Sequence, residues 1–291
     1  MKQPTAAKRI AIITGASSGI GSEFARQLST AADVDELWLI ARREDKLHAL
    51  STTLQENSTD ASARRICCRV LPLDVAGKAG VARFQALIAQ EHARTAFIIS
   101  WFINNAGFGT YGPFAKTALD RQLDMIELNC TALTGLCGVV LPYVAAGSHI
   151  INTASLAAFL PLGNFAVYAA TKAYALSFSY ALAAELKERG ISVCALCPGS
   201  VSTEFAAVAS NGARTDVLHG CSVEPVVRHC LAQARRGSRC AISRLPWKAA
   251  AFFSRFIGRS FGAWYSYRFR KRPAHPWHSP QQTEHSSEVS V

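Results

Sequence analysis

The sequence predicts an α/β protein with a Rossmann-like, doubly wound parallel sheet of about seven strands and helices on both faces, in a single domain. Three observations support this prediction. Short apolar runs alternate with longer segments of helical pattern through residues 9–244. A glycine-rich turn follows the first apolar run. Hydrophobic residues make up 49% of the 291 residues, and the mean hydropathy is +0.13, as expected for strands that are buried on both faces.

The strands and helices are expected in alternation. The apolar runs that predict strands are 9–13, 36–41, 66–73, 97–104, 149–154, 191–197 and 240–244. The segments that predict helices are 19–31, 43–57, 78–91, 119–144, 167–189 and 225–234. Because parallel strands joined by right-handed crossovers all end at one edge of the sheet, the residues that follow them should gather there.

The first strand ends in TGASSGIG, residues 14–21, and the segment after it predicts a helix. Glycines in such a turn let the backbone approach a ligand, and the N-terminus of the helix suits a pyrophosphate. The expected contacts come from Gly15, Ser17, Ser18, Gly19, Ile20 and Gly21. The spacing differs from the G-x-G-x-x-G of most Rossmann dehydrogenases, but the strand–turn–helix context still predicts a dinucleotide site.

Two arginines, Arg42 and Arg43, follow the second strand, where an acidic residue would bind the ribose hydroxyls of NAD. Guanidinium groups suit the 2′-phosphate of NADP(H), which they contact in bidentate fashion. The alternative is a solvated helix start, but a cationic pair is disfavoured at the positive end of the helix dipole. We therefore expect NADP(H) in preference to NAD.

Tyr168 and Lys172 lie four residues apart in the predicted helix 167–189, so they share one face of it. An ammonium beside a phenol favours the phenolate and lowers the phenol pKa. The pair therefore predicts a group that donates or accepts a proton near neutral pH. The spacing alone is common on helices, and the glycine-rich turn upstream gives it weight.

Five motifs in order resemble those of the short-chain dehydrogenase/reductase family. They are TGASSGIG at 14–21, NNAG at 104–107, Ser155, YxxxK at 168–172 and PG at 198–199. The resemblance covers residues 9–244 and implies an NADP(H)-dependent oxidoreductase. Such an enzyme transfers a hydride between the nicotinamide and a carbonyl or secondary alcohol.

The resemblance implies four catalytic residues, Asn129, Ser155, Tyr168 and Lys172. Tyr168 would be the general acid, and Ser155 would hold the substrate oxygen. Lys172 would lower the Tyr168 pKa and bind the nicotinamide ribose, and Asn129 would hold a water that links Lys172 to solvent. All four positions are present, whereas a non-catalytic nucleotide-binding regulator or scaffold, the alternative function, usually loses one.

The resemblance also implies further cofactor contacts. These are Asp74 and Val75 at the adenine, Asn105, Ala106 and Gly107 at the adenosine, Tyr168 and Lys172 at the nicotinamide ribose, and Pro198, Gly199, Val201 and Thr203 at the carboxamide end of the nicotinamide. Taken alone, Asp74 is equally an ordinary helix cap. Asn104 is expected to tie strands together instead of meeting the cofactor.

The loops that should face the hydride are rich in apolar side chains. They carry Phe108, Tyr111, Phe114, Leu156, Phe159, Leu160, Phe165 and Phe205. An apolar pocket predicts a small lipophilic ketone or alcohol, such as a fatty acyl, steroid or retinoid-like compound. Ordinary packing would explain about half of these side chains.

The net charge of +11 belongs to the C-terminal part, because residues 225–283 hold 12 Lys and Arg and no Asp or Glu. A helical wheel over 246–267 places Lys248, Arg255 and Arg259 opposite Ala250, Phe253, Ile257, Phe261 and Trp264. Two interpretations stay open: peripheral contact with an anionic membrane through 246–272, or a helix that covers the substrate cleft of its own subunit with its basic face in water. No nucleic acid is expected, since no recognition module accompanies the basic cluster.

We therefore expect three regions: the catalytic domain 1–244, the basic amphipathic segment 245–272 and a polar, disordered tail 273–291. No run of 18 or more apolar residues predicts a spanning helix, and the early first strand leaves no room for a signal peptide.

Nine cysteines without a framework suggest a reducing compartment, and we interpret Cys194 and Cys197 as strand residues with no metal. These features predict a cytoplasmic protein, with membrane association left open. The family resemblance implies a homodimer or homotetramer that pairs through the long helices.

Overall fold

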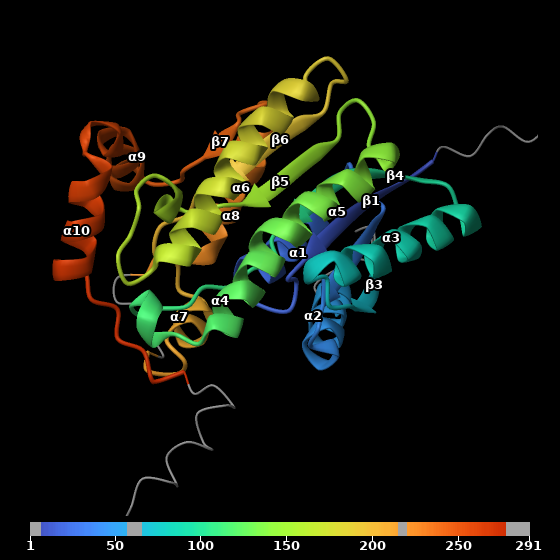
Figure 1. Ribbon diagram of the computed structural model, residues 1–291. Coiled ribbons are helices and arrows are strands. Elements are labelled where there is room, and N and C mark those ends of the chain that lie inside the picture. Colours follow the sequence, from blue (N-terminus) through green and yellow to red (C-terminus); the bar gives the residue numbers. More distant parts are fainter. Residues whose placement is uncertain (1–6, 57–65, 215–219, 278–291) are drawn as a thin grey trace, which may run out of the picture.

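The computed structural model describes residues 7–56, 66–214 and 220–277. Within these ranges the chain forms a seven-stranded parallel sheet in the order β3-β2-β1-β4-β5-β6-β7, with helices on both faces (Figure 1). The strands are β1 (Lys8–Thr14), β2 (Glu36–Ala41), β3 (Cys67–Pro72), β4 (Phe97–Asn104), β5 (His149–Thr153), β6 (Ser192–Leu196) and β7 (Cys240–Ala241). The predicted doubly wound fold is confirmed.

Helices connect the strands in the expected alternation. They are α1 (Gly19–Ser29), α2 (Glu44–Glu56), α3 (Gly77–Arg94), α4 (Leu119–Ile126), α5 (Leu133–Val140), α6 (Ala166–Glu185), α7 (Phe205–Ala209), α8 (Val223–Arg235), α9 (Leu245–Phe253) and α10 (Arg259–Phe269). Single turns occur at η1 (Phe114–Lys116), η2 (Glu127–Ala132), η3 (Leu141–Tyr143), η4 (Leu156–Ala158) and η5 (Ser254–Phe256).

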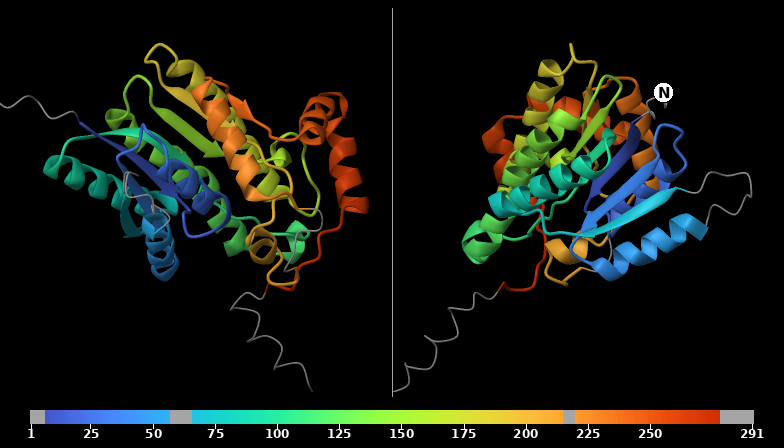
Figure 2. Two further views of the ribbon diagram at one scale, coloured as in Figure 1. Left: turned by 180° about the vertical axis from the view of Figure 1, so that it is seen from behind. Right: turned by 90° about the vertical axis from the view of Figure 1, so that its right-hand side faces the viewer.

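The core has two layers, one on each face of the sheet (Figure 2). Because successive strand residues point to opposite faces, Ala11 and Ile13 of β1 pack with α1, α2 and α8. Ile10 and Ile12 pack with α3, α5 and α6. The central strands are therefore apolar on both faces, which explains why they read as continuous hydrophobic runs.

The strand order reverses between β1 and β4, and ligands of open α/β sheets bind in the crevice at such a point. Thr14, the last residue of β1, joins the two loops that start here. Its Oγ1 accepts hydrogen bonds from the backbone of Asn105 (2.9 Å) and Ala106 (3.0 Å) and donates one to the Ile103 carbonyl (3.3 Å). The buried hydroxyl of Thr14 thus holds the loops that follow β1 and β4 next to each other.

The expected helix 119–144 is helical from Leu119 to Tyr143 but contains a π turn, η2, at its centre. By length and mean hydropathy (1.4) this stretch could cross a membrane. It packs instead against α3, α6 and β4, as a core helix does. π turns are frequent at functional sites, and this one carries Asn129.

The C-terminal segment differs from the continuous helix predicted over 246–267. It forms α9, η5 and α10, with a break before α10 whose N-cap is Gly258. Glycine is a poor helix former, which accounts for the break. Part of this segment covers the chain's own cleft, since Trp247, Arg270 and Arg272 line it. The aromatic side chains Phe253, Phe261 and Trp264, in contrast, are 60%, 57% and 54% exposed.

The end of the described chain lies against the catalytic body. The backbone N–H of His275 donates to the Ser210 carbonyl (3.0 Å), and Asn211 Nδ2 donates to the Pro276 carbonyl (3.0 Å). Of the segment 273–291 that we expected to be a polar tail, residues 273–277 therefore contact the body. Residues 278–291 lie outside the described part of the chain.

Candidate active site

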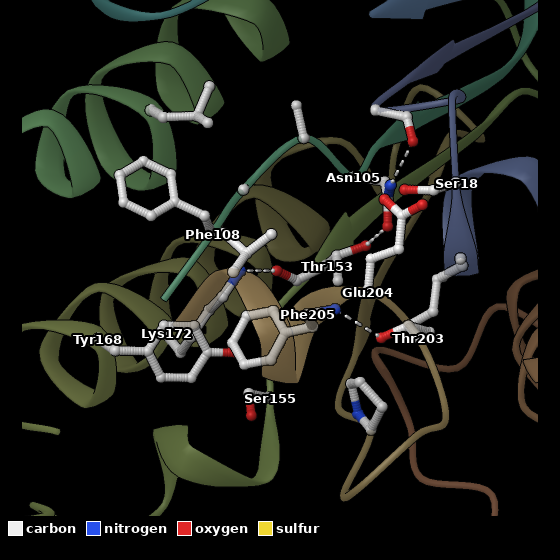
Figure 3. Close-up of a pocket in the computed structure, with 18 of the residues that line it drawn as sticks. Ser18, Asn105, Phe108, Thr153, Ser155, Tyr168, Lys172, Thr203, Glu204 and Phe205 are labelled. Carbon is white, nitrogen blue, oxygen red and sulfur yellow. Dashed lines mark hydrogen bonds between the residues drawn. The ribbon is translucent and has the colours of Figure 1, made fainter. Parts of the chain in front are cut away.

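A cleft of about 1050 Å³ opens at the carboxyl ends of the strands and brings most of the predicted site together (Figure 3). Its lining includes Gly15, Ser17, Ser18, Gly19, Ile20, Arg42, Arg43, Asp74, Val75, Asn105, Ala106, Gly107, Ser155, Tyr168, Lys172, Pro198, Gly199, Val201 and Thr203. The two predicted residues outside the lining are Gly21 and Asn129, which are buried beside it.

Two residues of the glycine-rich turn have backbone angles that only glycine adopts easily. Gly15 and Gly19 have φ values of +68° and +54°, in the left-handed region. A side chain on Gly21 would come within 2.1 Å of the Gly15 carbonyl oxygen, so that position admits no larger residue. The turn thus holds the N-terminus of α1 open toward the cleft.

The two asparagines after β4 have different roles. Asn105 links three strands: its Nδ2 donates to the Thr14 carbonyl (3.1 Å), and its Oδ1 accepts from Thr153 Oγ1 (3.1 Å). Asn104 points away from the cleft, and its Nδ2 donates to the Leu133 carbonyl (2.9 Å). As expected, Asn104 is structural, although it ties β4 to helix α5 and not to another strand.

The loop after β3 also serves two purposes. Asp74 lines the cleft, and its Oδ1 accepts a hydrogen bond from the backbone N–H of Ala76 (3.0 Å), just before α3. The N-cap of α3 is Ala76 and has no side-chain cap, so Asp74 closes a turn ahead of the helix, and its contact with adenine stays a prediction. Val75 beside it is 4% exposed and packs in the core layer of α3.

A basic cluster lies at the end of the cleft beside the glycine-rich turn. Arg43 donates from Nη2 to the hydroxyls of Ser17 (3.0 Å) and Ser18 (2.8 Å). Its Nη1 forms an ion pair with Glu204 (2.7 Å), and Lys46 contacts the same carboxylate (2.7 Å). These partners lower the pKa of Glu204 to about 2, with the Lys46 hydrogen bond as the largest cause.

Glu204 comes from the loop before α7, and Figure 3 shows its carboxylate directed toward Ser18. Sequence analysis missed Glu204 and Lys46. Lys46 lies one helical turn after Arg42, so its position on α2 was a usable signal. Nothing in the sequence indicated that Glu204 reaches this end of the cleft.

Tyr168 and Lys172 point into the cleft from α6. The Lys172 ammonium donates to the Thr153 carbonyl (2.7 Å) and lies 5.6 Å from the centre of the Tyr168 ring. The Tyr168 side chain is hydrogen-bonded to Ser155, which in turn caps η4 by accepting from the Ala157 N–H (3.1 Å). The structure therefore joins three of the four predicted catalytic side chains.

The pKa values correct one prediction. We expected Lys172 to lower the Tyr168 pKa, but burial dominates and raises that pKa well above its ordinary value. The hydrogen bond with Ser155 opposes this rise and is the smaller effect. Burial also lowers the pKa of Lys172 to about 8. The resting site therefore holds a neutral phenol beside an ammonium that loses its proton readily.

Asn129 is buried in the π turn behind Lys172. Its Nδ2 donates to the Phe108 carbonyl (2.9 Å) and to Thr171 Oγ1 (3.1 Å). A side chain on Gly107 would lie 2.8 Å from Asn129 Oδ1 and 3.4 Å from Lys172 Nζ. Glycine at 107 thus leaves a narrow space between these two polar groups.

The part of the cleft around Tyr168, called here the substrate half, combines apolar side chains, as predicted, with the guanidinium groups of Arg121 and Arg272. Its aromatic and aliphatic lining comes from Phe108, Tyr111, Leu156, Leu162, Phe165 and Phe205. The Phe165 ring stacks on the Tyr168 ring at 4.1 Å. Three residues of the predicted set lie elsewhere: Phe114 is 56% exposed, Phe159 packs against the core near β6, and Leu160 lines a second cavity.

Three further lining residues come from the C-terminal segment, Trp247, Arg270 and Arg272. A side chain on Gly199 would lie 2.4 Å from the Trp247 ring, so the indole packs directly on that glycine. None of the three belongs to a motif, and only the fold brings them to the cleft.

Of the two predicted strand cysteines, Cys194 lies in β6 and Cys197 directly follows it, and both are fully buried. In the described ranges, no group of three or more His, Cys, Asp or Glu side chains is placed to hold a metal ion.

Comparison with known proteins identifies the family. Residues 9–213 match the short chain dehydrogenases. The chain belongs to the short-chain dehydrogenase family. This result confirms the resemblance that the five motifs indicated.

Two members of the family show how far the likeness extends. A putative ketoacyl reductase of Streptomyces coelicolor is 33% identical over 205 residues, which are 68% of this chain and 72% of that protein. The probable oxidoreductase EphD of Mycobacterium tuberculosis is 29% identical over 204 residues, 67% of this chain but 31% of that protein. The chain thus spans about a third of the length of the EphD proteins that it matches.

Among solved structures, a short-chain dehydrogenase from Sphingobium yanoikuyae in complex with NADPH is 29% identical, with a TM-score of 0.71. The match covers 86% of this chain and 94% of that one.

Proposed function

We propose that this short-chain dehydrogenase is an NADP(H)-dependent oxidoreductase that acts on the carbonyl or secondary alcohol of a lipophilic compound. The observation that carries the proposal is the placement of Tyr168, Ser155 and Lys172 on the wall of the cleft that begins at the glycine-rich turn. A bound nicotinamide would supply or accept the hydride there.

The side chains suit carbonyl reduction. As a carbonyl is reduced, negative charge grows on its oxygen, and a buried neutral phenol can donate the proton that neutralises it. Tyr168 has this form, because burial raises its pKa. Ser155, its hydrogen-bond partner, would hold the same oxygen. Lys172 would stabilise the phenolate that remains, and Asn129 would hold a water behind it for proton resupply.

NADP(H) is the proposed cofactor because the end of the cleft at the glycine-rich turn is basic. Arg42 and Arg43 line it, Lys46 lies within reach of the same carboxylate as Arg43, and the Ser17 and Ser18 hydroxyls add hydrogen-bond donors. Guanidinium and ammonium groups recognise a phosphate, whereas NAD would offer them only ribose hydroxyls.

A lipophilic substrate is proposed from the apolar walls around Tyr168, and the name of the Streptomyces relative, a putative ketoacyl reductase, agrees with it. The test is a panel of lipophilic and polar ketones and aldehydes with NADPH and with NADH, followed by cofactor absorbance. The proposal expects turnover of lipophilic carbonyls with NADPH. Tight NADPH binding without turnover of any compound would instead support the regulator or scaffold.

We further propose that the protein is cytoplasmic and pairs through its long helices. All nine cysteines are free thiols, which suits a reducing compartment. Leu123 and Ile126 of α4 and Tyr174 and Tyr180 of α6 expose large apolar side chains on the surface expected to form the dimer. Sedimentation velocity on the purified chain should show a dimer or tetramer, and a monomer at every concentration would contradict this assembly.

A further inference from the structure

We propose that the surface formed by α9, η5 and α10 binds an anionic lipid bilayer. This surface, called here the aromatic surface, consists of the exposed side chains Phe252, Phe253, Phe256, Phe261, Trp264, Tyr265, Tyr267 and Phe269. Each is 41–74% exposed. The two helices stand together at one end of the molecule, apart from the main layers (Figures 1 and 2).

The aromatic rings touch one another but not the core. Phe252 contacts Phe253 and Phe256 at 5.4 and 5.7 Å, and on α10 Trp264 contacts Phe261 and Phe269 at 5.9 and 5.6 Å. The ring contacts form two groups, one on α9 and η5 and one on α10. Scattered apolar residues on a surface need no explanation, but grouped exposed aromatic rings indicate an interaction site.

The helices attach to the body through small residues. Ala251, Gly262 and Ser266 are their buried positions, and Ser266 Oγ accepts a hydrogen bond from the Gly163 backbone (2.8 Å). Asn164 Nδ2 donates to the Tyr267 carbonyl (3.0 Å). Trp247 of α9 is the exception, since it packs on Gly199. In α10 the pattern is the reverse of an ordinary amphipathic helix, in which the large apolar side chains face the protein.

The positive charge of this segment indicates which partner the aromatic surface binds. The same segment carries the exposed basic residues Lys248, Arg255, Arg259, Arg268, Arg270 and Lys271, and none forms an ion pair within the described ranges. Arg255 and Arg268 instead lie over Phe252 and Phe269, at 5.9 and 5.5 Å. Aromatic rings beside basic groups match the interface of an anionic bilayer. A second copy would bring like charges together, which is unfavourable.

The aromatic surface is also connected to the active site. A second cavity of about 360 Å³ lies between α10 and the loop that carries Leu160 and Leu162. Phe261 and Tyr265 line it from the aromatic surface, and Leu162, Arg270 and Arg272 line both this cavity and the catalytic cleft. If the function proposed above is correct, this cavity lies between the bilayer and the cleft that would take up a lipophilic substrate.

The test is sedimentation of the full chain with vesicles of phosphatidylcholine alone or mixed with phosphatidylglycerol. We expect pelleting only with the anionic vesicles and release by salt. Phe256→Ser with Trp264→Ser should abolish pelleting, whereas the exposed control Phe114→Ser should retain it. Arg255→Ala and Arg259→Ala should each weaken binding about fivefold, and the control Arg26→Ala should not.

Two results would overturn the proposal: no pelleting at low salt, or equal pelleting of the double variant. If the double variant no longer formed a dimer that the unaltered chain forms, the aromatic surface would be an interface between two copies of the chain. Turnover of a small water-soluble ketone should be the same in all these variants. Absence of that turnover in the unaltered chain would count against the proposed function and not against the lipid site.

A separate observation concerns Arg272, whose guanidinium lies in the substrate half of the cleft. It stacks on Phe165 (4.9 Å) and Tyr111 (5.9 Å), and its Nη1 is buried without a hydrogen-bond partner. The charged side chains nearest to it are Arg214 and Arg270, and it forms no ion pair in the described part of the chain. A buried polar group without a partner is costly, so a ligand is expected to supply one.

We infer that Arg272 binds an acidic group of the substrate, a carboxylate or a similar oxyanion. Phe165 contacts both residues that we propose to bind the substrate. Its ring stacks on the Tyr168 ring at 4.1 Å, and the Arg272 guanidinium lies 4.9 Å from its centre. The site would therefore accept an oxo acid with an apolar body, with the carbonyl at Tyr168 and the acid at Arg272. This inference rests on the proposed function.

The test compares an oxo acid with the ketone that has a methyl group in place of the carboxylate. For Arg272→Met we expect the KM of the oxo acid to rise about 10- to 100-fold, with KM for the neutral ketone nearly unchanged. Arg272→Lys should recover part of the loss. Equal effects on the two substrates would contradict the assignment. If neither substrate is turned over by the unaltered enzyme, the proposed function fails instead.

Discussion

Arg43 and Glu204 form an ion pair across the cleft, with 2.7 Å between Nη1 and Oε2. The first follows β2 and the second precedes α7, so the pair links two loops on opposite sides of the glycine-rich turn. Glu204 also binds Lys46 at 2.7 Å. The Glu204 carboxylate thus pairs with Arg43 and Lys46, the basic groups that we propose to bind the 2′-phosphate. It should therefore compete with that phosphate.

Replacing Glu204 with Gln should therefore favour NADPH. Because the pair is nearly half exposed, we expect only a two- to fivefold lower KM for NADPH, on the order of what exposed ion pairs contribute. The KM for NADH should not change. Steady-state kinetics with both cofactors test this, with the remote exposed variant Glu188→Gln as control. A higher KM for NADPH would show that the pair holds the cofactor in place.

Replacing Arg43 with Ala removes its contacts with Ser17 and Ser18 and the proposed contact with the phosphate. We expect the KM for NADPH to rise about 10- to 100-fold, as for loss of charged hydrogen bonds. The KM for NADH should stay within about twofold. A matched rise for both cofactors would mean that Arg43 supports the turn and does not select the phosphate.

Tyr168→Phe should separate chemistry from binding. The phenol is the proposed acid, so kcat should fall about 100- to 10,000-fold. NADPH affinity, measured by quenching of tryptophan fluorescence, should be nearly unchanged. Tyr111→Phe is the matched control, because Tyr111 lines the same cleft and its ring centre lies 4.8 Å from that of Phe165. Full activity in the Tyr168 variant would remove the assigned acid.

Lys172→Met should stabilise the protein while it abolishes activity. Burial lowers the Lys172 pKa from 10.5 to about 8, so below pH 8 the folded state carries a buried charge at a cost. That cost is relieved as pH rises from about 8 to about 10.5, where the unfolded lysine also loses its proton.

The Met variant should therefore be about 1–3 kcal/mol more stable than the parent at pH 7, and the difference should shrink toward pH 10. Urea unfolding at the two pH values measures it, with exposed Lys187→Met as a control that changes neither value. A variant less stable at pH 7 would show that the Lys172 hydrogen bond to Thr153 outweighs the cost of burial.

Much of the fold and site could be predicted because local sequence determines them. The alternation of apolar runs predicted all seven strands of the sheet, although β7 is shorter than expected. The glycine turn, Ser155 and the Tyr168–Lys172 pair follow strands or share one helix face, so their position needs no distant contact to be inferred.

The remaining features depend on contacts between segments far apart in the chain. Glu204 meets Arg43 across 161 positions, and Trp247 reaches Gly199 only because α9 folds back over the cleft. The Tyr168 pKa could not be predicted either, since burial, and not its neighbour on the helix, sets its direction. Gly258 was a usable signal for the break before α10.

The most direct measurement is a single turnover of a lipophilic ketone with NADPH that carries deuterium at both C4 positions of the nicotinamide. We predict that one deuterium per NADPH consumed appears on the carbinol carbon of the product, and that Tyr168→Phe binds the labelled cofactor without this transfer. A product alcohol without deuterium, or a product formed without net NADPH oxidation, would contradict hydride transfer to a carbonyl.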